Sequence, residues 1–572
     1  MLAIGEKMDY NCCIRWVGGS VCRPHTKGAE DMKTVSFQQF AATKSPALNF
    51  HDALKYCREQ GVNRLVVEPG VYEVDALLCS QRNLAISNHG HNGPKRIAAV
   101  IENMEDFEID FGGSTLVCSG IMTPIAILNS RNITIRNLKL KNPTVPMVEC
   151  RVIACGGDYV DVECLHGREN VTLLSGSLFG EYPCSMLAQV NTNIEFDGAT
   201  GEIAAGTTDH TLGTASAELR FEALDENHLR IFGVKRKPPV GNVLVFTCVR
   251  RVGAAIFCQH SHSLRFDHVD ICSCYGMGLL AQICSDISLN SFNTVREDGC
   301  LCTASADATH FVNCSGLITV ENSTFVGQMD DALNIHGIYT RILDKGEDWV
   351  LVREMHPEAT GIPIYQPGNT VQVLPADTLL PYTRKTVREV EVINDSCMRV
   401  YLAESAEDIR VGDDLENITL NADLIFRNNI VRDNRARGML IGTRGKVLIE
   451  NCTFRTRVTA IKFESDGAYW FESGGTTEVT IRGNRFDHCN DGWGTAVIEC
   501  QPREATEENR YFHGSIQVLQ NHFEAGVAQL ARIDNTAEFR FLDNTFTEKE
   551  AYVTVTHVGS QEIQDGIQVA GK

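Results

Sequence analysis

The sequence predicts an all-β protein folded as a parallel β-helix, a coil of short strands stacked rung upon rung. A module recurs in which two alternating apolar residues precede an Asn-rich turn and a closing apolar or aromatic residue, as in Ile133–Leu140 and Ile318–Phe325. Equivalent positions of neighbouring copies recur at a fixed spacing, as Phe266 and Leu289 do. A rung of fixed length with loops of variable length is typical of a solenoid. Further copies cover 447–454, 479–486, 516–523 and 539–546.

The regular spacing separates this fold from a β-sandwich with coincidental repeats. The spacing from Phe266 to Leu289 returns unchanged from Phe426 to Ile449 and from Val518 to Phe541, whereas longer loops stretch it elsewhere. Two-residue alternation turns the apolar side chains of each strand inward. The Asn in each turn tolerates the left-handed backbone conformation that a sharp corner needs.

Two spacings are too long for one rung and predict inserted domains. Ile135 and Phe266 hold equivalent places in the repeat, as do Val320 and Phe426, yet several rungs' length of chain separates the members of each pair. Subtracting one or two rungs leaves roughly 80–100 residues in each gap. Both gaps contain alternating runs typical of β-strands. We therefore expect a small β-barrel-like domain in each.

The chain then divides into six parts. An amphipathic helix over Ser45–Gln60, ended by Gly61, is expected to cap the first rung and cover its open edge. The predicted parts are a loose extension at 1–34, the amino-terminal β-helix with its capping helix at 35–144, a first barrel at 145–250, catalytic rungs at 251–339, a second barrel at 340–420 and the carboxy-terminal β-helix at 421–572.

Composition excludes several classes of protein. The chain has 572 residues, with 52 basic and 73 acidic side chains and a net charge of −21. This acidity argues against a nucleic-acid partner, which needs a basic surface. No apolar run is long enough to cross a bilayer, so no membrane partner is expected.

The cysteines indicate a reducing compartment. There are 22, and no Cys-x-x-Cys pair occurs. Spacings such as Cys272 and Cys274 put both thiols on one strand face, which suits buried core residues better than a zinc site, with scattered disulfides left open. The amino terminus lacks a secretory signal, and Met32 is an alternative start. These two features point to the cytoplasm, but the location itself is left open.

The strongest candidate for chemistry is a group of three aspartates. Asp330 and Asp331 interrupt an apolar stretch, and Asp307 precedes Asp330 by the spacing of one rung. Neighbouring rungs are about 4.8 Å apart, so the three carboxyl groups should share one site. Carboxylates this close do not ionise independently, and the pKa of at least one should rise. An acid and a base from one cluster is what glycosidic bond hydrolysis requires.

Residues around the cluster are candidates for substrate binding. His310 and His336 flank it and suit either a sugar hydroxyl or a hydrogen-bonded wall. Asn334 belongs to the same stretch, and Glu464 and Trp470 lie several rungs later. An aromatic ring at this place could stack on a sugar face or simply pack into the core.

These stretches resemble a known family. Residues 305–314 (Ser-Ala-Asp-Ala-Thr-His-Phe-Val-Asn-Cys), 328–341, 130–138 and 469–474 are similar to glycoside hydrolase family 110, and the resemblance runs from about Val35 to the end. It implies an α-1,3-galactosidase on a right-handed β-helix with inserted barrels. It further implies that terminal galactose is removed, including that of blood group B structures, with inversion and without a metal or other cofactor.

The three aspartates are also similar to those of family 28 polygalacturonases. Carried over, that motif makes Asp330 the acid and lets Asp307 and Asp331 hold the attacking water. The Arg-Ile-Lys tripeptide with which polygalacturonases bind a substrate carboxylate is missing, which disfavours an acidic sugar.

Three other hypotheses stay open. The chain could be a polygalacturonase-like hydrolase, a calcium-dependent polysaccharide lyase, since hard cations bind clustered carboxylates, or a β-helix that binds glycans without catalysis. The expected partners are terminal α-galactosyl glycans, and a homodimer is left open.

Overall fold

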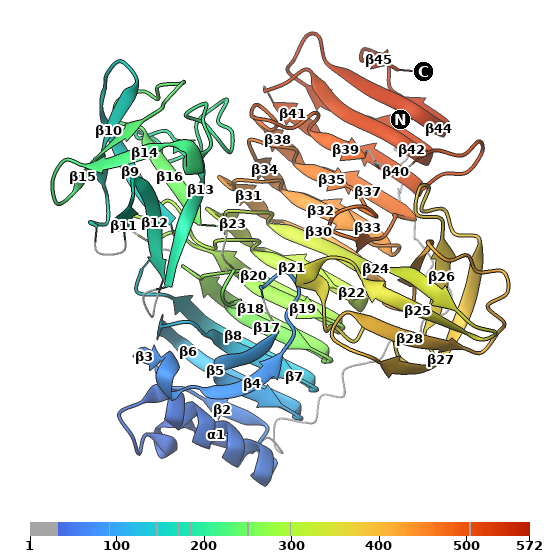
Figure 1. Cartoon of the computed structure of the whole chain (residues 1–572), viewed down its shortest axis with the longest axis horizontal. Coiled ribbons are helices and arrows are strands. Elements are labelled where there is room, and N and C mark those ends of the chain that lie inside the picture. Colours follow the sequence, from blue (N-terminus) through green and yellow to red (C-terminus); the bar gives the residue numbers. More distant parts are fainter. Residues whose placement is uncertain are drawn as a thin grey trace, which may run out of the picture.

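The computed structural model describes residues 33–571 except 91, 145–146, 169–170, 183–185, 249–250, 298, 501, 503–504 and 525. It is a parallel β-helix with two smaller β-domains inserted into its loops (Figure 1). The all-β fold class predicted from the repeats is therefore confirmed. Nearly all of the predicted extension at 1–34, with Met32, lies outside the described residues.

Three ladders of strands run along the β-helix. The first contains β1 (Thr34–Ser36), β2 (Arg64–Val66), β6 (Glu105–Ser119), β8 (Arg131–Lys141), β18 (His262–Ile271), β20 (Ser285–Thr294), β22 (Ser315–Glu321), β30 (Ala422–Arg427), β33 (Lys446–Glu450), β37 (Glu478–Arg482), β40 (His513–Leu519), β42 (Gln529–Leu542) and β44 (Tyr552–Ile563). The second contains β4 (Ser80–Leu84), β5 (Gly93–Glu102), β7 (Thr123–Leu128), β17 (Ile256–Gln259), β19 (Leu279–Gln282), β21 (Thr309–Val312), β24 (Leu333–Lys345), β32 (Met439–Gly442), β35 (Ile461–Phe463) and β39 (Ile498–Cys500), and it ends on β42, β44 and β45 (Gln568–Ala570). The third contains β23 (Thr324–Val326), β31 (Ile430–Arg432), β34 (Thr453–Arg455), β38 (Arg485–Asp487), β41 (His522–Glu524) and β43 (Thr545–Phe546), while β3 (Val71–Asp75) pairs with the end of β6.

The register of the first ladder agrees with the repeat spacing. Phe266 lies opposite Leu289, its equivalent in the next copy, and Val320 lies opposite Phe426 across the second oversized gap. The Asn corners behave as expected, because Asn322 and Asn451 adopt φ values of 53° and 54°. All four apolar side chains in these pairs are fully buried.

Helix α1 (Pro46–Gln60) covers the amino-terminal end of the coil. Proline occupies its first turn, and Gly61 ends it with a left-handed φ of 59°. The helix buries Phe50, Leu54 and Cys57 in the core of the β-helix, and its backbone blocks an otherwise open end. Short 3-10 turns lie at Phe37–Phe40, Ala76–Leu78, Ser216–Glu218 and Pro357–Ala359.

The first inserted domain is an antiparallel sheet that curls around its own apolar core. Its outer strand β14 approaches the turn before β12, where the Phe221 N–H donates to the Gly176 carbonyl at 2.8 Å. The strands are β9 (Met147–Cys155), β10 (Tyr159–Cys164), β11 (Val171–Leu174), β12 (Ser177–Tyr182), β13 (Met186–Phe196), β14 (Arg220–Ala223), β15 (His228–Phe232) and β16 (Val243–Cys248).

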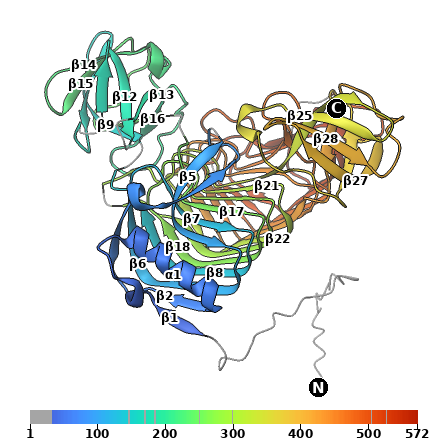
Figure 2. The same cartoon turned by 60° about the horizontal axis from the view of Figure 1, so that its bottom comes forward.

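The second inserted domain closes into a barrel. Its strands pair in the order β24, β25, β28, β27, β26, β29 and back to β24. Figure 2 shows that both domains project from the β-helix, well separated from each other. The strands not yet given are β25 (Trp349–Glu354), β26 (Thr370–Leu374), β27 (Thr383–Val392), β28 (Cys397–Leu402) and β29 (Asp414–Asn417).

The described cysteines are free thiols, and most are buried. Burial raises the pKa of Cys57 to about 11, so such thiols stay protonated and inert. Among the described residues, no helix is both long and apolar enough to span a membrane.

Candidate active site

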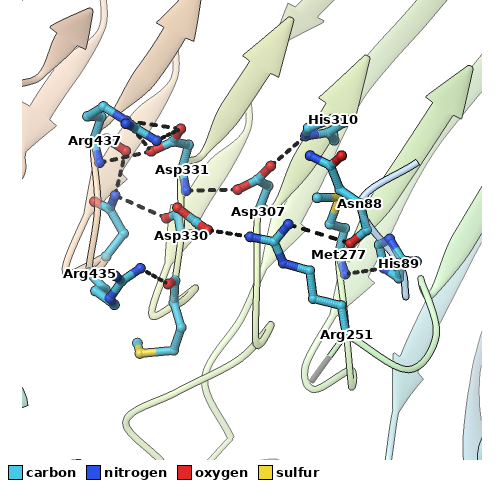
Figure 3. A network of polar contacts seen from close by, with 12 residues as sticks. Asn88, His89, Arg251, Met277, Asp307, His310, Asp330, Asp331, Arg435 and Arg437 are labelled. Atoms are coloured by element: carbon cyan, nitrogen blue, oxygen red, sulfur yellow. Dashed lines mark hydrogen bonds and ion pairs between the residues drawn. The ribbon is translucent and has the colours of Figure 1, made fainter. Parts of the chain in front are cut away.

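The candidate site lies where neighbouring strands of the second ladder begin (Figure 3). Asp307 precedes β21, Asp330 and Asp331 precede β24, and Arg437 precedes β32. Parallel strands start at the same edge of a ladder, so these side chains meet although 106 residues separate Asp331 from Arg437. The structure thus brings together all three predicted aspartates.

The local register differs by one position from the sequence-based one. Spacing alone paired Asp307 with Asp330, but the ladder joins Thr309 to Leu333, one position beyond the regular repeat. The turn before β24 is longer than that of a regular rung by this one position. Asp331 therefore lies beside Asp307, and its N–H donates to Oδ1 of Asp307 at 3.1 Å.

Two arginines pair with the aspartates directly. The Arg251 Nη2 donates to Oδ2 of Asp330 at 2.9 Å. Arg437 binds Asp331 through its Nε at 3.0 Å and its Nη2 at 2.9 Å, a two-point contact that fixes the carboxylate plane. Each of these two carboxylates therefore faces a guanidinium, and the opposite charge lowers the free-energy cost of burying both groups.

A third arginine, Arg435, connects the aspartate cluster to the first inserted domain. The guanidinium of Arg435 binds both oxygens of Asp209 at 2.8 and 2.7 Å and donates to the Met329 carbonyl at 3.3 Å. Asp209 belongs to the loop between β13 and β14. The inserted domain therefore positions the guanidinium of Arg435, whose charge helps to lower the pKa of Asp330.

Asp307 and Asp330 lie on neighbouring rungs, and their pKa values are shifted in opposite directions. Burial, followed by the charge of Asp330, raises the pKa of Asp307 to about 8. Burial also raises the pKa of Asp331 to about 7, against the pull of Arg437. For Asp330 burial again works upward, but Arg251 and the nearby arginines outweigh it and hold its pKa below the usual value. At neutral pH the cluster therefore contains both a protonated acid and an ionised base.

A small pocket opens onto the cluster. Asn88 and Arg251 contribute to its lining, as does the loop that follows β35. The lining residues are Asn88, Arg251, Asp307, Asp330, Asp331, Asn334, Arg437, Leu440, Glu464, Ser465, Asp466, Trp470 and Glu472.

Three of the five predicted substrate-binding residues line this pocket. Asn334 has a buried Oδ1 without a hydrogen-bond partner in the structure, which suits a ligand hydroxyl. Trp470 is 36% exposed, and its ring packs on His356 of the second barrel at 4.5 Å. Glu464 pairs with Lys462 at 2.8 Å.

His310 and His336 do not line the pocket. His310 is fully buried behind Asp307, and its Nδ1 lies 2.6 Å from Oδ2 of that carboxyl group. His336 is 6% exposed and lies behind His310. Sugar contact, one of the two interpretations of the sequence, does not fit these positions, whereas a hydrogen-bonded wall does.

Sequence reasoning missed the arginines and Glu472. Arg437 carried a usable signal, because its offset from Asp331 is the same as that of Phe426 from Val320. Arg251 carried none, since it lies in the connection between the last strand of the first inserted domain and β17, where rung spacing does not apply.

Fold and site together define a β-helix protein with an acid–base carboxylate cluster in a pocket. A family profile described as "GLAA-B beta-barrel domain II" matches residues 349–415, and one described as "Right handed beta helix region" matches 416–571. The coil is thus right-handed, as predicted.

Several curated relatives of the chain are named as α-1,3-galactosidases. The chain is 29% identical to alpha-1,3-galactosidase B of Bacteroides fragilis over 82% of both chains. It is 28% identical to alpha-1,3-galactosidase A of Shewanella woodyi over 89% of this chain and 84% of that one. Among solved structures, a family 28 exopolygalacturonase of Yersinia enterocolitica aligns over 92% of this chain and 78% of its own, with 12% identity and a TM-score of 0.41. The sequence relatives confirm the predicted resemblance and put the chain among the glycosidases.

Proposed function

We propose that the chain is an exo-acting α-galactosidase that removes terminal α-1,3-linked galactose from glycans, blood group B structures among them. The observation that supports this most is the cluster of Asp307, Asp330 and Asp331 at one pocket, with acid and base forms side by side. The sugar and the linkage rest on the names of the relatives.

The hydrogen bonds and charges favour Asp307 as the acid and Asp330 as the base. The Oδ2–H of Asp307 turns from Nδ1 of His310 to the glycosidic oxygen and gives that oxygen its proton as the bond to the anomeric carbon breaks. A water held by Asp330 transfers a proton to that carboxylate and adds to the anomeric carbon, which gives galactose and the shortened glycan. This reverses the roles that the polygalacturonase motif suggested, because Arg251 favours the ionised form of Asp330.

We further propose that the reaction proceeds with inversion. Each of the three aspartates offers one oxygen within 4.8 Å of the oxygens of the other two, so the selected oxygens lie closer together than the carboxyl groups of an inverting pair, which are about 6.5–9.5 Å apart. The short spacing alone would suit a covalent intermediate. However, arginine or histidine already engages Asp307, Asp330 and Asp331, and a carboxylate held in this way is better suited to orient a water than to attack carbon.

Galactose is proposed to contact Asn334, Glu464 and Trp470. The free Oδ1 of Asn334 would accept a hydrogen bond from a hydroxyl group, and the indole would cover an apolar sugar face. The second barrel would act through His356, whose ring supports Trp470.

A calcium-dependent lyase is the alternative with a specific observation behind it, since the same three oxygens could surround a cation. Three guanidinium groups already offset the carboxylate charge, which disfavours a divalent ion there. We therefore propose that no metal takes part.

The test is a side-by-side assay of α-1,3-, α-1,4- and α-1,6-linked galactosides, with and without calcium. Galactose release that is fastest from the α-1,3 linkage supports the proposal. Calcium-dependent formation of unsaturated products from acidic polysaccharides would replace it by the lyase. Binding of a galactoside without any cleavage would replace it by the non-catalytic hypothesis.

A further inference from the structure

A line of hydrogen bonds runs inward from Asp307 to a backbone carbonyl. Oδ2 of Asp307 lies 2.6 Å from Nδ1 of His310, and Nε2 of His310 lies 3.0 Å from Nε2 of His336. Nδ1 of His336 lies 2.7 Å from the carbonyl oxygen of Gly337. All of these side chains are buried, so water does not compete for the contacts.

The carbonyl sets the direction of the hydrogen bonds in this line when both histidines are neutral. It can only accept, so Nδ1 of His336 carries a hydrogen. Nε2 of a neutral His336 is then an acceptor, and the hydrogen between the two rings belongs to Nε2 of His310. Nδ1 of a neutral His310 is in turn an acceptor, which leaves Oδ2 of Asp307 as the donor. With both histidines neutral, the polarity of the line therefore places a proton on Oδ2 of Asp307.

We infer that His310 and His336 are positioning residues that hold one shared proton on the Asp307 line and thereby keep this carboxyl group in its acid form. The inference deepens the proposed hydrolase function and rests on it for the catalytic consequence, though not for the proton positions.

The shared proton has a second resting place. If Oδ2 passes its proton to Nδ1 of His310 while Nε2 of His310 passes its own to His336, Asp307 becomes a carboxylate and His336 an imidazolium. No proton is gained or lost. Glu472, whose Oε1 lies 3.6 Å from Nε2 of His336, would stabilise that form and also lines the pocket.

Loss of the proton to solvent breaks the line. With one hydrogen fewer, two acceptors must face each other at one of the three contacts, so a hydrogen bond is given up together with the proton. This cost opposes ionisation, in the same direction as the burial that raises the pKa of Asp307. The titratable and charged groups that face the line are Asp330, Asp331, Arg251, Arg437, His89 and Glu472.

The pH dependence of hydrolysis tests the inference. In His310→Asn the amide can accept from the acid form or donate to the carboxylate, and it is too short to maintain the line to His336. The alkaline limb of the pH–rate profile reflects the ionisation of Asp307. We expect this limb to move to lower pH by about 1 unit or more, with KM unchanged. The control is His513→Asn, another fully buried histidine that hydrogen-bonds Thr476 and does not line the pocket. A uniform fall in kcat with both limbs in place would overturn the inference.

Histidine nitrogen NMR of the full chain supplies a readout that needs no turnover. The expected tautomers are opposite, with the hydrogen on Nε2 in His310 and on Nδ1 in His336, and the His310→Asn and His336→Asn variants assign the signals. A hydrogen on Nδ1 of His310 and none on its Nε2, together with a neutral His336 at a pH below the activity limb, would make two acceptors face each other between the rings and would refute the line. This outcome is separate from a failure of the proposed function, which would show as no cleavage of any galactoside.

Discussion

Asp307 and Asp330 lie on neighbouring rungs, yet their surroundings give them different charges. Asp307 faces a neutral imidazole, because burial, followed by His336, holds the pKa of His310 well below its usual value. Asp330 faces the guanidinium of Arg251. The same residue type thus provides an acid at one position and a base at the other.

Substitution of the two aspartates should separate the roles. Asp307→Asn should lower hydrolysis of an α-1,3-linked disaccharide by about 10²–10⁴-fold but largely spare an aryl α-galactoside with an acidic leaving group, which needs no proton. Asp330→Asn should reduce hydrolysis of both, because the water loses its base. Steady-state kinetics on the two substrates measure this, with the exposed Asp158→Asn as control. Equal losses for Asp307→Asn on both substrates would contradict the acid assignment.

Chelation should leave activity unchanged. The carboxylate charges are balanced by Arg251 and Arg437 at 2.9 Å, so the cluster needs no cation for its stability. The measurement is the rate of galactose release after dialysis against excess chelator, compared with the same sample given calcium. Loss that calcium restores would show a metal-assisted reaction instead.

At the residue scale, the sequence predicted the three aspartates but not the groups that set their pKa values. Their identity followed from a local motif and one rung of spacing. Their protonation depends on Arg251, which lies just after the first inserted domain, and on the orientation of the His310 and His336 rings. The repeat spacing predicts neither of these features.

Among the elements, the short strand β36 (Glu472–Ser473) connects the proton line to the pocket. It pairs antiparallel with β24 through Gly337 and Ser473. A methyl group on Gly337 would overlap Oγ of Ser473 and approach Oδ1 of Asn313. Glycine is therefore required here for the close approach of β36, not for a special backbone angle.

Gly337→Ala should displace β36 and with it the pocket wall. We expect a loss of kcat/KM of at least about tenfold, since small displacements of positioning groups are costly, and a lowered melting temperature. Gly157→Ala, at a glycine with open space around it, is the matched control and should change neither quantity. Full activity of Gly337→Ala would show that β36 does not position the site.

The strand register was predictable wherever repeats follow each other directly. Apolar alternation fixed pairs such as Phe266 and Leu289, and Asn451 marked a corner. The register failed by one position at Asp307, where the turn before β24 is longer. The strand order inside the barrels was beyond spacing arguments, because pairs such as β9 and β16 join segments far apart in sequence.

Over the whole molecule, the continuous core of the coil encloses many of the thiols. Cys118 and Cys258 are fully or nearly fully buried, whereas Cys155 in the first barrel is exposed. Burial also raises the pKa of the core thiols, which slows their reaction further.

Thiol labelling of the native protein should therefore follow burial. We expect Cys155 to react with a soluble disulfide reagent before Cys118 and Cys258, and all of them to react once the chain is denatured. Mass spectrometry of labelled peptides identifies the sites. Early labelling of Cys118 or Cys258 in folded protein would contradict the packed core.

Proton NMR of the first minutes of hydrolysis of an α-1,3-linked galactose disaccharide tests the catalytic role of the cluster most directly. The carboxylate cluster predicts that galactose is released and that its β-anomer appears first, because a water held by Asp330 adds opposite the departing oxygen. Asp330→Asn should release none on the same timescale. An initial α-anomer would show a covalent intermediate, and undiminished release by Asp330→Asn would show that the cluster is not the catalytic site.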